Sequence, residues 1–377
     1  MKKLKLMTVV GTRPEIIRLS RVMAVCDQYF DHVLVHTGQN YDYELNEIFF
    51  TDLGIRKPDH FLNAAGATGA ETIGNVIIAV DKVLEQVQPE ALLVLGDTNS
   101  CLAAYMAKRL HIPVFHMEAG NRSFDFNVHE ETNRRVIDHI ADYNLVYTEH
   151  ARWHLLSEGL PHRRIYLTGS PMREVLSFYK TNIENSGILD SLSLTKGGYF
   201  VVSTHREENV DNAPNLDKIL IVLNELAKNY NLPIIVSTHP RTRKRIEQLG
   251  ERNLDSKIMF LKPFGFFDYV HLQQNALCTI SDSGTISEES SVLGFPAISL
   301  RQSMERPEAQ DTGSIILTGF DPSVILNSVA MIVDERRDRE TYSIPEDYQI
   351  NDTSWRVVKL IMGNCKLSNS WNGIHEK

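Results

Sequence analysis

Residues 4–15 read LKLMTVVGTRPE and contain the unit from which the fold is built. The apolar, partly β-branched run at residues 4–10 predicts a buried strand, and Gly11 predicts a tight turn after it. Pro14 suits the first positions of a helix, which we expect from about residue 15. A strand, a glycine turn and a helix in this order are typical of an α/β domain.

The same alternation continues on both sides of a polar segment at residues 181–196. Before this segment, further strands are predicted at residues 32–36, 91–95, 112–116, 143–146 and 164–167. After it, strands are predicted at residues 199–203, 233–237, 257–260, 278–281 and 297–300. Amphipathic stretches at residues 72–87, 101–110 and 215–228 predict helices between them. Such alternation predicts parallel sheets with helices on both faces.

A length of 377 residues exceeds what one ordinary core organises, so we predict two domains. The predicted fold is α/β, with two Rossmann-like domains whose parallel sheets face a cleft. The first domain spans residues 1–180, and the second spans residues 197–352 after the polar linker. Residues 353–377 contain a final helix that we expect to pack back on the first domain.

Composition excludes several classes of protein. The net charge of −9 argues against a nucleic-acid partner, because phosphate backbones need a basic surface. The four cysteines, Cys26, Cys101, Cys278 and Cys365, form no C-x-x-C pair, which favours a reducing compartment and disfavours structural zinc. The apolar N-terminal run is too short for a signal peptide, and no stretch reaches the length of a membrane span. We therefore expect a cytoplasmic protein with no membrane partner.

Several cofactor motifs are missing. No G-x-G-x-x-G follows a strand, and no G-x-x-x-x-G-K-[ST] occurs, which disfavours a nicotinamide or ATP site. The residue four positions after His129 is Asn133, so the zinc motif H-E-x-x-H is absent as well. We expect neither a cofactor nor a metal.

Three carboxylates are the main candidates for acid–base chemistry. Asp97 follows the strand at 91–95, Glu118 follows the strand at 112–116, and Glu130 begins a predicted helix. Each one alone is explained as a helix cap or an ion pair, such as Glu130 with Arg134 four residues on. Three carboxylates at one edge of a sheet favour a shared cleft, in which one serves as base and another as acid.

Candidate phosphate contacts lie at other strand ends. Arg13 stands near a predicted helix start, where anions are favoured. Ser283 and Gly284, in SDSGT at 281–285, join a strand to a helix in the same way, and Glu288 or Glu289 could bind ribose hydroxyls. The alternative is plain helix capping by serine, with glutamates favoured by the helix dipole.

Two histidines follow equivalent strands of the second domain, each beside an arginine. His205 and Arg206 follow the strand at 199–203, and His239 follows the strand at 233–237 with Arg241 close behind. Arg306 adds charge after the strand at 297–300. Such side chains are suitable partners for phosphate oxygens.

The ordered set of motifs resembles the non-hydrolysing UDP-N-acetylglucosamine 2-epimerases over most of the chain. The motifs are VGTRPE at 10–15, GDT at 96–98, HMEAGNR at 116–122, EETNR at 130–134, THREE at 204–208, SDSG at 281–284 and ERPE at 305–308. The resemblance implies the two-domain fold of B-type glycosyltransferases, with UDP held mainly by the second domain. It also implies a homodimer without a cofactor.

The reaction of that family implies roles for the candidate residues. UDP is eliminated across C1–C2 of the sugar and added back to the 2-acetamidoglycal with C2 inverted. The resemblance makes Asp97, Glu118 and Glu130 the acid and base candidates, with their assignment to a face left open. It places His205, as a fourth catalytic residue, at the diphosphate with Arg13 and the Ser283–Gly284 turn, and it places Glu289 at the ribose.

Departures from the usual family pattern suggest a branch. Asn40-Tyr41 replaces a His-Arg pair in a region that binds an activator in some members, and residues 346–354 lack the usual C-terminal glycine-rich stretch. These variants resemble the branch that makes UDP-N-acetyl-L-fucosamine from UDP-2-acetamido-2,6-dideoxy-L-talose for capsule or O-antigen. The alternatives are a UDP-GlcNAc/UDP-ManNAc 2-epimerase, a hydrolysing epimerase, a B-type glycosyltransferase and a non-catalytic sugar-nucleotide binder.

Overall fold

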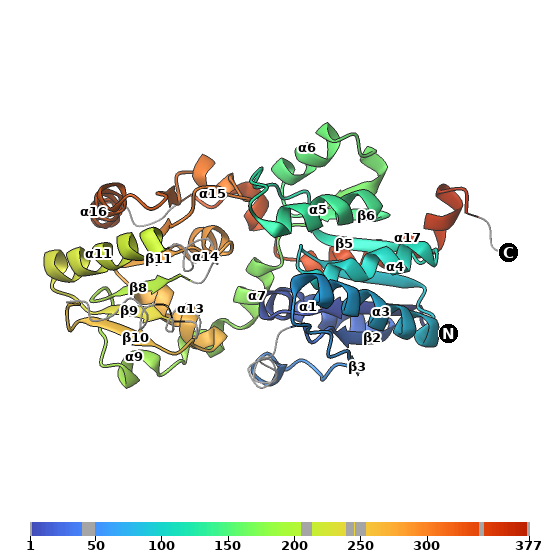
Figure 1. Ribbon diagram of the computed structural model, residues 1–377, viewed down its shortest axis with the longest axis horizontal. Coiled ribbons are helices and arrows are strands. Elements are labelled where there is room, and N and C mark those ends of the chain that lie inside the picture. The colour runs from blue at the N-terminus through green and yellow to red at the C-terminus, as the bar shows by residue number, and fades with distance from the viewer. Residues whose placement is uncertain are drawn as a thin grey trace. The chain divides into compact units, whose positions relative to one another are not determined.

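The computed structural model describes residues 2–39, 50–204, 213–238, 245, 254–338 and 343–374. The chain divides into two compact units. Unit 1 consists of Met1–Ser177 and Asp347–Lys377, and unit 2 consists of Phe178–Glu346. Each unit is built around one parallel sheet with helices on its faces (Figure 1). The prediction of an α/β fold with two parallel-sheet domains is confirmed.

The sheet of unit 1 has seven strands in the order β3-β2-β1-β4-β5-β6-β7. In chain order they are β1 (Lys5–Val10), β2 (Asp31–His36), β3 (His60–Phe61), β4 (Ala91–Leu95), β5 (Val114–Ala119), β6 (Tyr143–Val146) and β7 (Ile165–Leu167). All neighbours pair in parallel. The order reverses between β1 and β4, and ligands of open α/β sheets bind beyond the carboxyl ends of strands at such a point.

Helices cover both faces of this sheet (Figure 1). They are α1 (Arg13–Tyr29), α3 (Gly69–Val87), the 3-10 turn η1 (Asn99–Leu102) leading into α4 (Ala103–Arg109), α5 (His129–Ile140), α6 (Glu149–Ser157) and α7 (Met172–Phe178). Val76, Val80 and Leu84 of α3 pack with the small residues of α4 against β1, β2 and β4. Burial of these apolar faces is the main stabilising term of the unit.

The last helix, α17 (Thr353–Trp371), belongs to unit 1 although it ends the chain. It packs along α1, where Trp355 and Tyr29 lie with ring centroids 5.4 Å apart. Val357 and Ile361 are buried on the same face of α17. The final helix predicted within residues 353–377 thus runs to Trp371, and its apolar spacing continues to Cys365.

Unit 2 contains a six-stranded parallel sheet in the order β10-β9-β8-β11-β12-β13. Its strands are β8 (Phe200–Ser203), β9 (Ile234–Ser237), β10 (Ile258–Leu261), β11 (Cys278–Ser281), β12 (Ala297–Ser299) and β13 (Ile316–Leu317). The covering helices include α11 (Ala213–Tyr230), α13 (Phe266–Asn275), α14 (Ile286–Leu293), α15 (Glu308–Asp311) and α16 (Pro322–Asp338). Helices α11 and α16 share one buried core with the sheet.

The polar segment predicted as a linker is structured. Residues 180–191 form the short helices α8 (Lys180–Glu184) and α9 (Ile188–Ser191) within unit 2. Leu194 is buried with Tyr199 and Leu272, and Ile188 packs on the same cluster. The few apolar residues of this segment pack toward α13. The segment looks like a linker in the sequence because most of its residues are polar.

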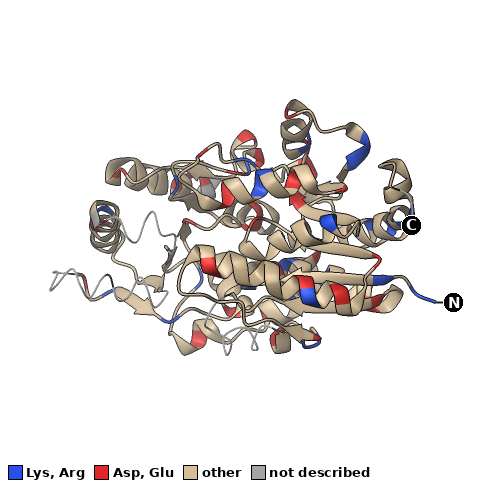
Figure 2. Cartoon of the chain, turned by 45° about the vertical axis from the view of Figure 1, so that its right-hand side comes forward, with Lys and Arg blue, Asp and Glu red and all other residues tan. Residues whose placement is uncertain are grey.

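Lys, Arg, Asp and Glu are interspersed along the described helices rather than gathered by sign (Figure 2). None of the helices that the structure describes is long and apolar enough to cross a membrane.

Candidate active site

The ends of β4 and β5 bring two of the three predicted carboxylates together in unit 1. Asp97 follows β4 after Gly96, whose φ of 73° makes the turn, and Glu118 lies at the end of the neighbouring β5. A Cβ placed on Gly96 would lie 4.0 Å from the Glu118 carboxyl carbon. The two acids therefore occupy one edge of the sheet, beside each other.

Glu118 sits in a bulge. Its φ is 64°, in the left-handed region, and the pairing register of β5 with β6 shifts between Met117 and Ala119. A non-glycine residue rarely adopts this conformation, and a bulge turns a side chain away from its regular direction. The Glu118 carboxylate forms a buried ion pair with Arg18 of α1. Backbone strain of this kind clusters at functional sites.

Asp97 is held from α5. Arg134 contacts its carboxylate oxygen Oδ2 through Nε at 2.6 Å and through Nη2 at 2.5 Å. Asn133 donates from Nδ2 to the Asp97 carbonyl oxygen at 2.8 Å. The Asp97 side chain keeps 15% of its surface exposed, so its carboxylate is anchored and still reachable.

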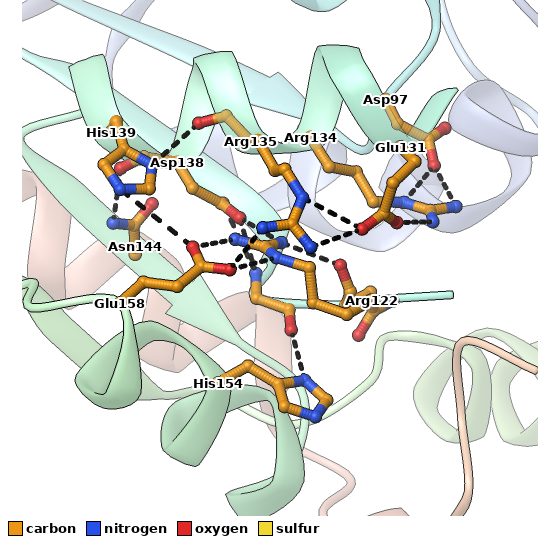
Figure 3. Close-up of polar contacts among 12 residues, drawn as sticks. Asp97, Arg122, Glu131, Arg134, Arg135, Asp138, His139, Asn144, His154 and Glu158 are labelled. Carbon is orange, nitrogen blue, oxygen red and sulfur yellow. Dashed lines mark hydrogen bonds and ion pairs between the residues drawn. The ribbon is translucent and has the colours of Figure 1, made fainter. Parts of the chain in front are cut away.

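A larger group of charges, which we call the charge cluster, continues from this contact (Figure 3). It consists of Asp97, Arg122, Glu131, Arg134, Arg135, Asp138 and Glu158. Glu131 accepts from the Ser123 backbone N–H at 3.0 Å and from Arg135 Nη2 at 2.9 Å. Burial alone would raise the pKa of Glu131, but these contacts hold it below its usual range.

Glu130, the third predicted carboxylate, differs from its neighbour. It lies in the first turn of α5 and is exposed, whereas Glu131 is buried in the charge cluster. Arg134, expected as a partner of Glu130, instead contacts Asp97 and Glu131. The spacing of residues 131, 134 and 138 places them on one face of the helix, and this pattern could have identified Glu131 from the sequence.

The GTRPE turn is organised by Glu15, which the sequence analysis missed. Glu15 accepts hydrogen bonds from the backbone N–H groups of Gly11 and Thr12, the latter at 2.8 Å, and from the Thr98 hydroxyl at 2.6 Å. Complete burial raises the pKa of this carboxyl despite those hydrogen bonds. Arg13, a predicted phosphate contact, is the first residue of α1 and is half-buried.

In unit 2, the predicted phosphate turn lies between β11 and α14. Ser283 Oγ lies 2.9 Å from Thr285 Oγ1, and the Thr285 N–H donates to Ser283 Oγ at 3.3 Å. Buried Arg306 donates to the carbonyl oxygen of Gly284, and its Nε lies 3.6 Å from Glu288 Oε1. Arg306 therefore supports the turn, in addition to any contact with a ligand.

Glu289, the predicted ribose contact, is nearly buried beside two residues that the sequence analysis did not select. Gln273 donates to its Oε2 at 3.0 Å, and both side chains are buried. Burial raises the pKa of Tyr269, which lies near Glu289, above its ordinary value. Helix α13 thus supplies polar groups to the site at β11.

Three predicted residues, His205, Arg206 and His239, lie outside the described residues, as does Asn40-Tyr41. The strands before the histidines, β8 and β9, are neighbours of each other and β8 is a neighbour of β11. Within the described part of the chain, no group of three His, Cys, Asp or Glu side chains is placed to hold a metal ion.

The sequence matches a known protein family. A family model described as UDP-N-acetylglucosamine 2-epimerase covers residues 24–362. The chain belongs to this family. Its members are isomerases, and the chain is an enzyme of that class.

Individual relatives align with nearly the whole of this chain. A solved UDP-N-acetylglucosamine 2-epimerase from Rickettsia bellii is 48% identical, with a TM-score of 0.90 over 97% of this chain and 98% of that one. The Methanocaldococcus jannaschii enzyme, solved with UDP-GlcNAc and UDP, is 33% identical, with a TM-score of 0.89 over 96% and 100%. A UDP-2,3-diacetamido-2,3-dideoxy-D-glucuronate 2-epimerase from Pseudomonas aeruginosa is 34% identical over 330 residues, or 86% and 91%.

Proposed function

We propose that the chain epimerises C2 of a UDP-N-acetylhexosamine by eliminating UDP to a bound 2-acetamidoglycal and adding it back. The observation that supports this most is the pair of carboxylates, Asp97 and Glu118, at adjacent strand ends. Removal of the C2 proton needs a base, and protonation of the opposite face needs an acid. Glu130, exposed on the first turn of α5, is the third proposed acid–base group.

The amide variants Asp97→Asn, Glu118→Gln and Glu130→Gln test this assignment. We expect turnover to fall by at least about 100-fold for an acid or base, with UDP affinity retained. Glu184→Gln is the matched control, since Glu184 is an exposed glutamate on α8 whose Oε1 lies 3.7 Å from Lys180 Nζ. Full turnover in all three variants would remove the basis of the assignment. Binding of UDP with no turnover in the wild type would indicate a binding protein.

UDP binding is assigned to unit 2 in this proposal. The turn at Ser283 and Gly284 offers N–H and hydroxyl donors at a helix start, and we assign the ribose hydroxyls to Glu289. We also assign diphosphate contacts to His205, Arg206 and His239, and separately to Arg13, on the basis of the sequence motifs. Titration calorimetry with UDP should show that Ser283→Ala weakens binding several-fold, by the loss of about one hydrogen bond. The same change at exposed Ser323 should leave binding unchanged.

For the sugar, we propose UDP-2-acetamido-2,6-dideoxy-L-talose, converted to UDP-N-acetyl-L-fucosamine for surface polysaccharide. The sequence departures at residues 40–41 and 346–354 support this choice. UDP-GlcNAc is the second candidate, because several relatives are named for it. The ratio of kcat/KM for the two sugars decides between them, and free sugar released together with UDP would identify a hydrolysing enzyme instead.

We also propose that the enzyme is a cytoplasmic homodimer. All four cysteines are buried thiols outside any disulfide, which suits a reducing compartment. Ile78 of α3, Tyr105 of α4 and Val136 of α5 are exposed apolar residues on helices that neighbour one another. Light scattering coupled to size exclusion should give twice the chain mass, and Tyr105→Glu should lower it if this surface is the interface.

A further inference from the structure

One buried carboxylate connects the backbone turns that carry Asp97 and Glu118. Asp138 lies on the inner face of α5, and its side chain has no exposed surface. Its carboxylate accepts from the Gly120 N–H at 3.1 Å and from Arg122 Nη1 at 2.7 Å. It also lies 2.9 Å from Nδ1 of buried His116.

The second nitrogen of His116 reaches the other turn. Nε2 lies 2.8 Å from the carbonyl oxygen of Gly96, the residue before Asp97. A carbonyl oxygen only accepts hydrogen bonds, so Nε2 must carry a proton. Burial alone would raise the pKa of Asp138, but the hydrogen bond and charge of His116 and the charge of Arg122 hold it below its usual range. The ring of His116 therefore donates from Nε2 to the Gly96 carbonyl oxygen and places Nδ1 against the Asp138 carboxylate, which links the two turns.

We propose that Asp138 and His116 are a positioning pair that fixes the Gly96–Asp97 turn and the Glu118–Gly120 bulge against each other. Neither side chain touches the reacting atoms in this account. Asp138 holds the bulge through the Gly120 N–H and holds the neighbouring turn through the ring of His116. The inference rests on the proposed function, in which Asp97 and Glu118 are acid and base.

The matched control lies at the other end of the same strand. Asp142 is also buried, and its carboxylate accepts from the Val114 N–H at 3.0 Å, where β5 begins. Asp138→Asn and Asp142→Asn therefore make the same chemical change near opposite edges of one sheet. A merely structural role predicts that the two variants lose thermal stability and turnover alike.

Steady-state kinetics with the epimerase substrate, on the folded fraction of each variant, separate the two roles. We expect Asp138→Asn to lower kcat on the order of 100-fold with little change in KM, because misplacing catalytic groups by about 1 Å has that effect. Asp142→Asn should keep kcat within about threefold of wild type. Equal kcat losses in the two variants would overturn the proposal.

A second measurement applies to the wild type and does not depend on variant folding. Nitrogen-15 NMR of histidine-labelled protein distinguishes protonated from unprotonated ring nitrogens. The His116 signals are identified by sequential resonance assignment. A proton is expected on Nε2, protected from solvent exchange by its hydrogen bond to the Gly96 carbonyl oxygen, and an unprotonated or rapidly exchanging Nε2 overturns the proposal.

Failure of this inference is distinguishable from failure of the proposed function. If Asp97→Asn and Glu118→Gln lose turnover while Asp138→Asn keeps it, only the positioning pair is wrong. If Asp97→Asn and Glu118→Gln both keep turnover, the proposed acid–base function is wrong, and the positioning pair falls with it.

Discussion

Glu118 of β5 and Arg18 of α1 form a buried ion pair, with about 7% of each side chain exposed. Glu118 reaches this partner from a bulge with φ of 64°. Glu118 thus combines a strained backbone with a buried charge. Both are unfavourable in isolation, so the surrounding packing and the ion pair must hold them in place. The motif GTRPE is thereby linked to the end of β5 through α1.

Replacing Arg18 should destabilise the folded protein. Arg18→Met leaves the Glu118 carboxylate buried without its guanidinium, and we expect a loss of about 3–5 kcal/mol in the free energy of unfolding. Urea denaturation measures this. The double variant with Glu118→Gln should recover part of the loss, and strictly additive losses would show that the two side chains are not coupled.

The glycine after the bulge should not tolerate a side chain. Gly120 has φ of 80°, and a Cβ there would lie 2.3 Å from the carbonyl oxygen of Ala151. Gly120→Ala should therefore destabilise by more than about 1 kcal/mol. Gly74 within α3 is the control, since a Cβ there meets nothing within 4 Å. Gly74→Ala should stabilise by about 0.4–1 kcal/mol, and thermal melts that rank the pair the other way would contradict the description of this turn.

Stability should depend on pH through Glu131. Its pKa lies below the ordinary value of 4.5 in the folded state, despite burial, because of Ser123, Arg135 and Arg134. A carboxylate with a depressed folded pKa contributes stability above its unfolded pKa and loses it as the pH falls through the folded pKa. The stability difference between wild type and Glu131→Gln should thus be largest at neutral pH and shrink below about pH 4.5. If the stability difference between wild type and Glu131→Gln grew as the pH fell, the lowered pKa of Glu131 would be wrong.

Arg134 should not be replaceable by lysine. Two nitrogens of its guanidinium contact Asp97 and a third contacts Glu131 at 3.3 Å, a fork that a single ammonium group does not reproduce. We expect Arg134→Lys to lower kcat at least about tenfold while UDP affinity, measured by calorimetry, stays unchanged. Arg356→Lys, in an exposed pair on α17, is the control and should leave kcat unaltered. Wild-type turnover in Arg134→Lys would show that Asp97 needs no such anchor.

The sequence predicts the fold well where apolar runs are continuous. The strands at 91–95 and 278–281 coincide with β4 and β11, because a parallel strand buried on both faces leaves an uninterrupted apolar signal. The helices at 180–191 were missed because Ile183 is an isolated buried apolar residue in a polar stretch.

The site is predictable in part. Asp97 and Glu118 stand at strand ends, which a strand prediction locates. The bulge at Glu118 has no sequence signal, because a left-handed backbone at glutamate is imposed by packing and not by residue type. Arg18 and Glu15 were missed for a related reason, since charged residues on the buried face of α1 show their partners only in three dimensions.

The most direct test of the account is proton NMR of the purified protein with a UDP-N-acetylhexosamine in D₂O and no added cofactor. UDP-GlcNAc and UDP-2-acetamido-2,6-dideoxy-L-talose are run in parallel. The account predicts deuterium at C2 of an inverted sugar that is still attached to UDP, for at least one of the two. A C2 proton retained in both sugars, with active enzyme and bound UDP, would contradict it.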